Sequence, residues 1–222
     1  MSVASKYILL QRSNFLISRS IPLVNRLPVA TRVNLEAMIR SEESIVKPYI
    51  KSMEAEYTSL LPALPKQASN ILDIGCGLAG IDIFLYRHYG TPTIHLLDKN
   101  GLSKELYFGL EAEATFYNSL ALAQQLLEKN GVKTKDIVTI DIDKETFPKT
   151  KFDIIVSLLA WGFHFPVETY LQEVKRSLSE NGVLIIDVRK SSTGEKVLRE
   201  NFRNVRALNF DDKKATRLVC SM

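Results

Sequence analysis

Short apolar runs alternate with helical patterns along roughly the last two thirds of the chain. The runs are rich in Ile, Leu and Val, which is typical of strands buried on both faces of a parallel sheet. Five strands are predicted, at Ile71–Ile74, Thr93–Leu97, Ile137–Ile142, Asp153–Leu158 and Val183–Val188. Helices are predicted at Ile81–Tyr89, Ser119–Asn130, Val167–Leu178 and Gly194–Phe202. This alternation indicates an α/β fold, doubly wound around a mostly parallel sheet.

Two further apolar runs lie near the C-terminus, at Val205–Phe210 and Ala215–Cys220. The polar segment Asp211–Lys214 separates them. Two strands joined by a tight polar turn form an antiparallel hairpin. We therefore expect a seven-stranded sheet that ends in an antiparallel C-terminal hairpin.

Residues 1–67 have a different pattern. Apolar side chains recur there at a seven-residue interval, at Leu9, Leu16 and Leu23. Such spacing predicts helices. We expect residues 1–67 to form a helical N-terminal cap over the ligand cleft of a domain at residues 68–222. The same helices are candidates for a homo-oligomer contact.

The first predicted strand leads into a turn that contains Gly75, Gly77 and Gly80. Glycine allows positive φ and lets a ligand approach the backbone closely. Backbone amides at the start of the following helix can face a polar or anionic ligand. The spacing of these glycines equally fits a dinucleotide site. The turn therefore predicts a nucleotide cradle and leaves its occupant open.

Composition and charge narrow the class of protein. The apolar fraction is 45%, and no apolar run approaches the ~20 residues of a membrane span. Cys76 and Cys220 lack the spacing of metal ligands, so we expect no metal site and a reducing compartment. These features predict a soluble, cytoplasmic protein without a membrane partner.

The net charge of +4 is unevenly distributed. Residues 1–35 carry five basic residues and no acidic one, whereas the rest of the chain carries 24 basic and 25 acidic residues. An acid-free N-terminus also resembles an organellar transit peptide, which is the alternative to a cytoplasmic location. The chain lacks a dense basic patch interleaved with aromatic residues, so a nucleic-acid partner is not expected.

Acidic residues follow two of the predicted strands. In an open α/β sheet the ligand lies beyond the carboxyl ends of the strands. Asp98 is placed to accept hydrogen bonds from two ribose hydroxyls, because a carboxylate offers two acceptor oxygens. Asp141 and Asp143 close the third strand, and one of these two carboxylates is placed to accept from an adenine amino group while a neighbouring amide, such as that of Ile142, donates to the ring. The other of the two is expected to be solvated. The long segment Lys99–Asn118 is either an ordered insertion near this site or a lid.

An aromatic patch follows the fourth predicted strand. It contains the only Trp of the chain, Trp161, together with Phe163 and His164. We expect it at the mouth of the cleft, where it suits an apolar or sugar-like face. A histidine there can remove a proton from a substrate hydroxyl, although a structural role for His164 stays open.

From about Asn70 to the C-terminus, the chain resembles a class I S-adenosylmethionine-dependent methyltransferase with a Rossmann-like fold. The resemblance rests on Asp73–Gly77, on Asp98 and Asp141, on the strand Phe152–Ser157 and on the closing hairpin. It implies that S-adenosylmethionine is the cofactor. It further implies that Gly75 and Gly77 contact the methionine portion, Asp73 its amino end, Asp98 the ribose, and Asp141 with Ile142 the adenine.

The segments 116–119 and 161–166 resemble small-molecule and sugar O-methyltransferases. We therefore expect O-methylation of a small hydroxylated acceptor, sugar or natural-product-like. His164 is the expected general base, and Trp161 with Phe163 shapes the acceptor pocket. The alternatives are a nicotinamide-dependent oxidoreductase, an RNA methyltransferase and a catalytically idle cofactor-binding partner protein. The motif Asn/Asp-Pro-Pro-Tyr/Phe is missing after the fourth strand, which argues against methylation of a nucleic-acid base amino group.

Overall fold

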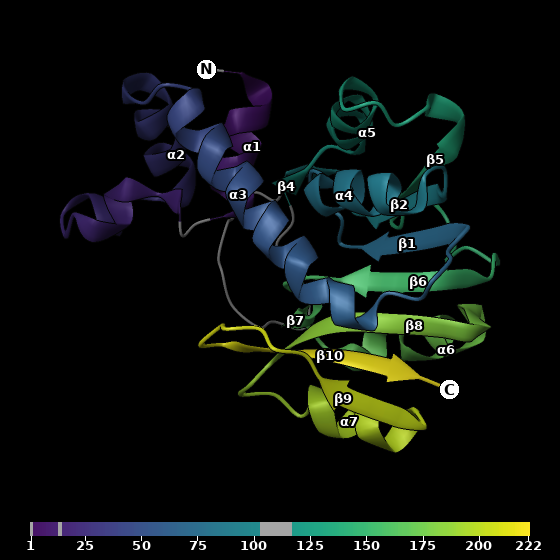
Figure 1. Cartoon of the computed structure of the whole chain (residues 1–222). Coiled ribbons are helices and arrows are strands. Elements are labelled where there is room, and N and C mark those ends of the chain that lie inside the picture. The colour runs from purple at the N-terminus through teal and green to yellow at the C-terminus, as the bar shows by residue number, and fades with distance from the viewer. Residues whose placement is uncertain (1, 13–14, 103–116) are drawn as a thin grey trace.

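The computed structural model describes residues 2–12, 15–102 and 117–222 (Figure 1). Its main element is a seven-stranded sheet. From one edge to the other the strands are β5 (Ile137–Asp141), β2 (Thr93–Asp98), β1 (Asn70–Ile74), β6 (Phe152–Ser157), β8 (Leu178–Arg189), β10 (Ala215–Ser221) and β9 (Asn204–Ala207). The pairs from β5 through β8 are parallel, and β10 is antiparallel to both β8 and β9. The predicted sheet and its closing hairpin are confirmed.

Helices cover both faces of the sheet, as a doubly wound fold requires. The four that follow the N-terminal region are α4 (Gly80–Tyr89), α5 (Leu120–Lys129), α6 (Leu171–Ser177) and α7 (Gly194–Asn201). Successive residues of a strand point to opposite faces. Ile71 accordingly packs in one core with α4 and α5, while Leu72 packs in the other with α6 and α7.

Two predicted elements differ in detail from the structure. The predicted helix Val167–Leu178 is divided into a 3₁₀ turn, η6 (Val167–Thr169), and the shorter helix α6. The strand predicted at Val183–Val188 begins earlier, at Leu178, and its pairing with β6 shifts register near Phe152. The first part of the strand was not predicted, because the polar residues between Leu178 and Val183 interrupt its apolar pattern.

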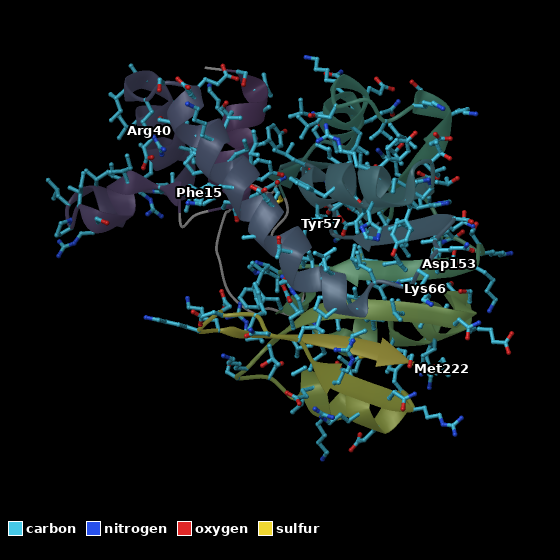
Figure 2. The ribbon with its side chains drawn as sticks, viewed as in Figure 1. Phe15, Arg40, Tyr57, Lys66, Asp153 and Met222 are labelled. Carbon is cyan, nitrogen blue, oxygen red and sulfur yellow. The ribbon has the colours of Figure 1, made fainter. Side chains whose placement is uncertain are left out.

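The N-terminal residues are helical, as predicted. They form α1 (Val3–Gln11), α2 (Val29–Ile39) and α3 (Glu43–Leu60), joined by the 3₁₀ turns η2 (Ile17–Ser20) and η3 (Val24–Arg26) and followed by η4 (Leu61–Ala63). Arg40 ties α2 to its neighbours, since its Nη1 donates to the carbonyl of Phe15 and to Glu36, each at 2.8 Å (Figure 2). The three helices share a core with Leu78 of the glycine turn. The exact boundary at residue 67 stays a prediction.

The parallel strands direct their carboxyl ends toward the side on which α1 and α2 gather (Figure 1). At the opposite end of β1, the Asp153 carboxylate accepts from the amides of Ser69 and Asn70 at 2.8 and 3.1 Å (Figure 2). Most of the predicted insertion Lys99–Asn118 lies outside the described residues; its ends pair as the short strands β3 (Gly101–Leu102) and β4 (Tyr117–Asn118). Among the helices described, none is long and apolar enough to cross a membrane.

Candidate functional site

The glycine turn between β1 and α4 has the strained backbone that the sequence predicts. Gly75 has φ of +76° and Gly77 has φ of +55°. Residues other than glycine rarely adopt this backbone conformation. A Cβ on Gly75 would collide with the side chain of Ala160. A Cβ on Gly77 would lie 2.8 Å from Oε1 of Gln11. Both positions therefore require glycine, because neighbouring atoms approach the backbone of the turn closely.

Asp98, at the end of β2, is hydrogen-bonded to the backbone of the glycine turn. Its Oδ2 accepts from the Gly77 amide and from Asn118 Nδ2, each at 2.9 Å, and its Oδ1 accepts from the Lys99 amide at 2.8 Å. Burial raises the pKa of Asp98 to about 6, against the opposing effect of these three donors. The structure thus brings Asp98 to the glycine turn. A carboxylate has about four lone-pair positions, so acceptor capacity remains.

Two buried carboxyl groups lie behind the turn. Asp73 of β1 is 3% exposed, and Asp82 in the first turn of α4 is fully buried. In the described part of the chain, neither carboxylate oxygen of Asp82 accepts a hydrogen bond. Burial raises the pKa of Asp82 to about 7, and burial followed by the charge of Asp82 raises the pKa of Asp73 well above its ordinary value. The pair therefore retains a proton near neutral pH unless a cation approaches.

Helix α1 forms part of the same site. The Gln11 side chain accepts from the Leu78 amide at 3.2 Å and donates to Asn118 Oδ1 at 3.3 Å. The next residue, Arg12, pairs with Glu56 of α3 at 2.7 Å. Neither Gln11 nor Asp82 was predicted from the sequence. Gln11 is far from the turn along the chain and carries no local signal, whereas an acidic residue in the first turn of a helix after a glycine turn was a usable signal for Asp82.

Asp141 and Ile142 lie beside Asp98, at the carboxyl end of β5. The Cα atoms of Asp98 and Asp141 are partners in the parallel register. Asp141 is 8% exposed and accepts from Lys144 Nζ at 2.7 Å. The Ile142 amide donates to the Asp98 carbonyl at 3.1 Å. The structure therefore brings the two acids together, with the Ile142 amide in a backbone hydrogen bond.

The aromatic patch forms a strand, β7 (Ala160–Phe165), which packs against β8. Trp161 is fully buried, and its Nε1 donates to the carbonyls of Pro166 and Val167 at 3.1 and 2.9 Å. Phe163 and His164 are half-buried, with their ring centres 5.0 Å apart. The patch therefore divides into a core residue, Trp161, and two residues that solvent reaches.

A buried ion pair supports the turn into β7. Arg217 donates to both oxygens of Asp187 at 2.7 Å, and both side chains are fully buried. Asp187 Oδ2 also accepts from the Leu159 amide at 3.1 Å, where Leu159 has φ of +54°. Among the described residues, no group of three His, Cys, Asp or Glu side chains is arranged to hold a metal ion.

Comparisons with known proteins define the class. A family model described as a methyltransferase domain matches residues 49–218. No curated protein matches the chain in a sequence search. The chain belongs to the methyltransferase-domain family, and it has the predicted fold of a class I S-adenosylmethionine-dependent methyltransferase with S-adenosylmethionine as its cofactor.

Solved structures share this fold at low sequence identity. A ribosomal protein L11 methylase from Lactobacillus delbrueckii is 18% identical, with a TM-score of 0.54 over 74% of each chain. A precorrin-6y C5,15-methyltransferase from Geobacter metallireducens is 14% identical, with a TM-score of 0.51 over 75% of this chain and 85% of that one. A putative O-methyltransferase from Nostoc punctiforme is 13% identical, with a TM-score of 0.58 over 82% and 59%. These proteins differ in acceptor, so the shared fold leaves the acceptor of this chain open.

Proposed function

We propose that this protein transfers a methyl group to a hydroxyl oxygen of a small acceptor, sugar or natural-product-like, with His164 as the general base. The observation that carries the proposal is the position of β7. Its first residue, Ala160, lies against Gly75 of the glycine turn. His164 follows four residues further along the same strand, at most about 13 Å from Ala160 at a strand rise of ~3.3 Å per residue.

The residues around the turn fit S-adenosylmethionine. The cofactor is a cation at its ammonium and sulfonium groups, and the buried carboxyl groups of Asp73 and Asp82 can lose their shared proton when such a cation approaches. Gly75 and Gly77 allow close approach to the backbone. We propose that these four residues hold the methionine portion. Asp98 is then the ribose ligand, and Asp141 lines the adenine end with Ile142.

When bound, S-adenosylmethionine supplies an electrophilic methyl group. The chain has to align the acceptor oxygen, exclude water and accept the hydroxyl proton. His164 is half-exposed and so accessible to an acceptor. A positioned general base contributes about 10²–10⁴-fold to the rate. Phe163 offers the acceptor an apolar face, while Trp161 supports β7 from the core.

We also propose that residues 1–67 act as a cap on the cofactor side. Gln11 covers Gly77 and bonds to the Leu78 amide, so the first helix already closes one side of the cradle. The proposal of a homo-oligomer through these helices is tested by the molar mass of the full chain in light scattering.

The cofactor half of the proposal is tested by thermal unfolding. S-adenosylhomocysteine at ~100 times its dissociation constant should stabilise the wild type by about 2.7 kcal/mol. Gly131→Ala is the matched control, because Gly131 also has positive φ but no atom lies within 4 Å of its added Cβ. We expect this control to respond to the ligand and Gly77→Val not to. Stabilisation by a nicotinamide dinucleotide alone would instead favour the oxidoreductase.

The acceptor half is tested by transfer of labelled methyl groups. Pools of hydroxylated small molecules, glycans and RNA are offered to the full chain. We expect label on a hydroxyl of a small molecule. Label on RNA would identify an RNA methyltransferase, and label on none of the pools would favour the catalytically idle partner protein.

A further inference from the structure

Arg189 lies against Phe163 of β7, and its positive charge has no part in the proposed chemistry so far. It is the last residue of β8, which runs parallel to β6. Its position is therefore at the same edge of the sheet as the glycine turn, where open α/β sheets bind their ligands. The side chain is half-buried.

The neighbouring strand holds the guanidinium in place. Arg189 Nε donates to the carbonyl of Phe163 at 2.8 Å. The guanidinium carbon lies 4.2 Å from the centre of the Phe163 ring, within the range of a cation–π contact. The same ring meets His164 edge-on at 5.0 Å between ring centres. Arg189 and the candidate base His164 thus contact one aromatic side chain.

No carboxylate neutralises this cation in the part of the chain that the structure describes. Its contacts there are the Phe163 carbonyl and the Phe163 ring. Two other arginines with buried or partly buried side chains do pair with a carboxylate. Arg217 pairs with Asp187 and Arg12 with Glu56, at 2.7 Å in each case. Burial of Arg189 lowers its pKa, because partial loss of water penalises the charged form. An anion that contacts the free side of the guanidinium would relieve this penalty.

The geometry of the free side selects the kind of anion. A guanidinium has five N–H donors in a planar fork, and Nε accounts for one of them. The two terminal nitrogens match the paired oxygens of a carboxylate or phosphate. Since Phe163 holds the plane of the fork, little side-chain freedom is lost when such a group binds.

We infer that Arg189 binds a carboxylate or phosphate group of the methyl acceptor, so that the substrate class is a hydroxylated acid or a phosphorylated hydroxyl compound. This inference rests on the proposed methyl transfer to a hydroxyl. Arg189 fixes the anionic end of the acceptor, and His164, whose ring meets Phe163 edge-on, accepts the proton of the hydroxyl. The two sources of the anion, a carboxylate and a phosphate, share this chemistry.

The test measures binding of three probes to the full chain saturated with S-adenosylhomocysteine. Calorimetry compares glucuronate, glucose 1-phosphate and neutral glucose. We expect at least one charged probe to bind more tightly than glucose, and the tighter of the two charged probes identifies the anion. Arg189→Gln should weaken that binding by about 10- to 100-fold, the usual effect of losing a hydrogen bond to a charged group. Arg189→Lys should recover part of it, since it keeps the charge without the fork.

Arg176→Gln is the matched control. It removes the same charge from an exposed side chain on α6, where Arg176 pairs with Glu173 at 3.4 Å. We expect Arg176→Gln to bind the charged probe as the wild type does. Equal binding of all three probes, or unchanged binding after Arg189→Gln, would overturn the inference. Binding of S-adenosylhomocysteine itself is measured separately for each variant, so a failure of the cofactor site is recognised independently of Arg189.

Discussion

Two regions of the sheet bury carboxylates, and they differ in how the charge is balanced. Next to β7, the two carboxylate oxygens of Asp187 accept hydrogen bonds from Nε and Nη2 of Arg217, each at 2.7 Å. Behind the glycine turn, Asp82 is equally buried, yet its oxygens accept no hydrogen bond from the residues described. A buried charge without a partner is costly, and such sites cluster where proteins bind ligands or perform chemistry. Asp187 therefore has a structural role, and under our proposal Asp82 lies where the cationic part of the cofactor binds.

Removing Arg217 should produce the largest loss of stability. Arg217→Met leaves the Asp187 carboxylate buried without its partner, which typically costs about 3–5 kcal/mol. Urea denaturation of the full chain measures this change. Arg199→Met is the control, because its pair with Glu195 is exposed and should change stability by about 1 kcal/mol or less. The double variant Arg217→Met/Asp187→Leu should recover much of the loss; no recovery would mean that Arg217 acts through packing alone.

Removing His164 should affect the rate and leave the fold intact. His164→Ala should lower turnover of the identified acceptor by about 10²–10⁴-fold, because the hydroxyl proton loses its acceptor. Affinity for S-adenosylhomocysteine should be unchanged. His88→Ala is the control, since His88 lies at the C-terminal end of α4, away from the glycine turn at its N-terminal end, and bonds to the Tyr57 hydroxyl. Near-normal turnover of His164→Ala would remove the general base from the proposal.

The glycine turn should tolerate no side chain at Gly75. Gly75→Ala combines the strain of positive φ, about 1–2 kcal/mol, with a collision at Ala160 of about 1–3 kcal/mol. Gly131→Ala has the strain without the collision. The difference between the two variants in urea denaturation isolates the contact between the turn and β7. Equal losses would show that β7 adapts and does not fix the turn.

The buried carboxyl groups around the glycine turn should make the stability of the protein depend on pH. The folded-state pKa of Asp82, about 7, and that of Asp98, about 6, are raised. The folded state therefore binds protons more tightly than the unfolded state, and the free energy of unfolding should fall as pH rises from about 4 to about 7. The slope for one proton is at most ~1.4 kcal/mol per pH unit.

Asp82→Asn should reduce that slope, because the amide cannot ionise, while Asp98 and Asp73, the other carboxyl groups around the turn with raised pKa, still contribute. Denaturation at several pH values between 4 and 8 provides the measurement. Asp143→Asn, which removes an exposed acid paired with Lys99 at 3.3 Å, should leave the slope as in the wild type. An undiminished slope after Asp82→Asn would show that Asp82 does not contribute to it.

Local sequence patterns predicted the glycine turn and the position of the acids beside it. A buried parallel strand needs an apolar run, and a backbone with positive φ needs glycine, so β1 and the turn at Gly75 and Gly77 were readable from neighbouring residues. Asp98 and Asp141 were found because parallel strands bring their carboxyl ends to one edge. These features depend on residues that are close in sequence.

The acceptor side was less predictable. The sequence grouped Trp161 with Phe163 and His164, whereas the fold buries Trp161 and leaves the other two accessible. The role of Arg189 is visible only because β8 places it against Phe163. Likewise, the chain brings Gln11 to the turn from its first helix.

By itself the sequence determined the α/β fold, the glycine turn, the acids at its edge and the methyltransferase class. Periodic burial of apolar side chains and positive φ in a turn depend on neighbouring residues, so they can be recognised in a short stretch of sequence. Only the tertiary structure decided which buried charges are balanced and which side chains contact Phe163 and His164. Those properties depend on groups far apart in the chain, such as Arg217 beside Asp187 and Arg189 against Phe163, and no local pattern encodes such pairs.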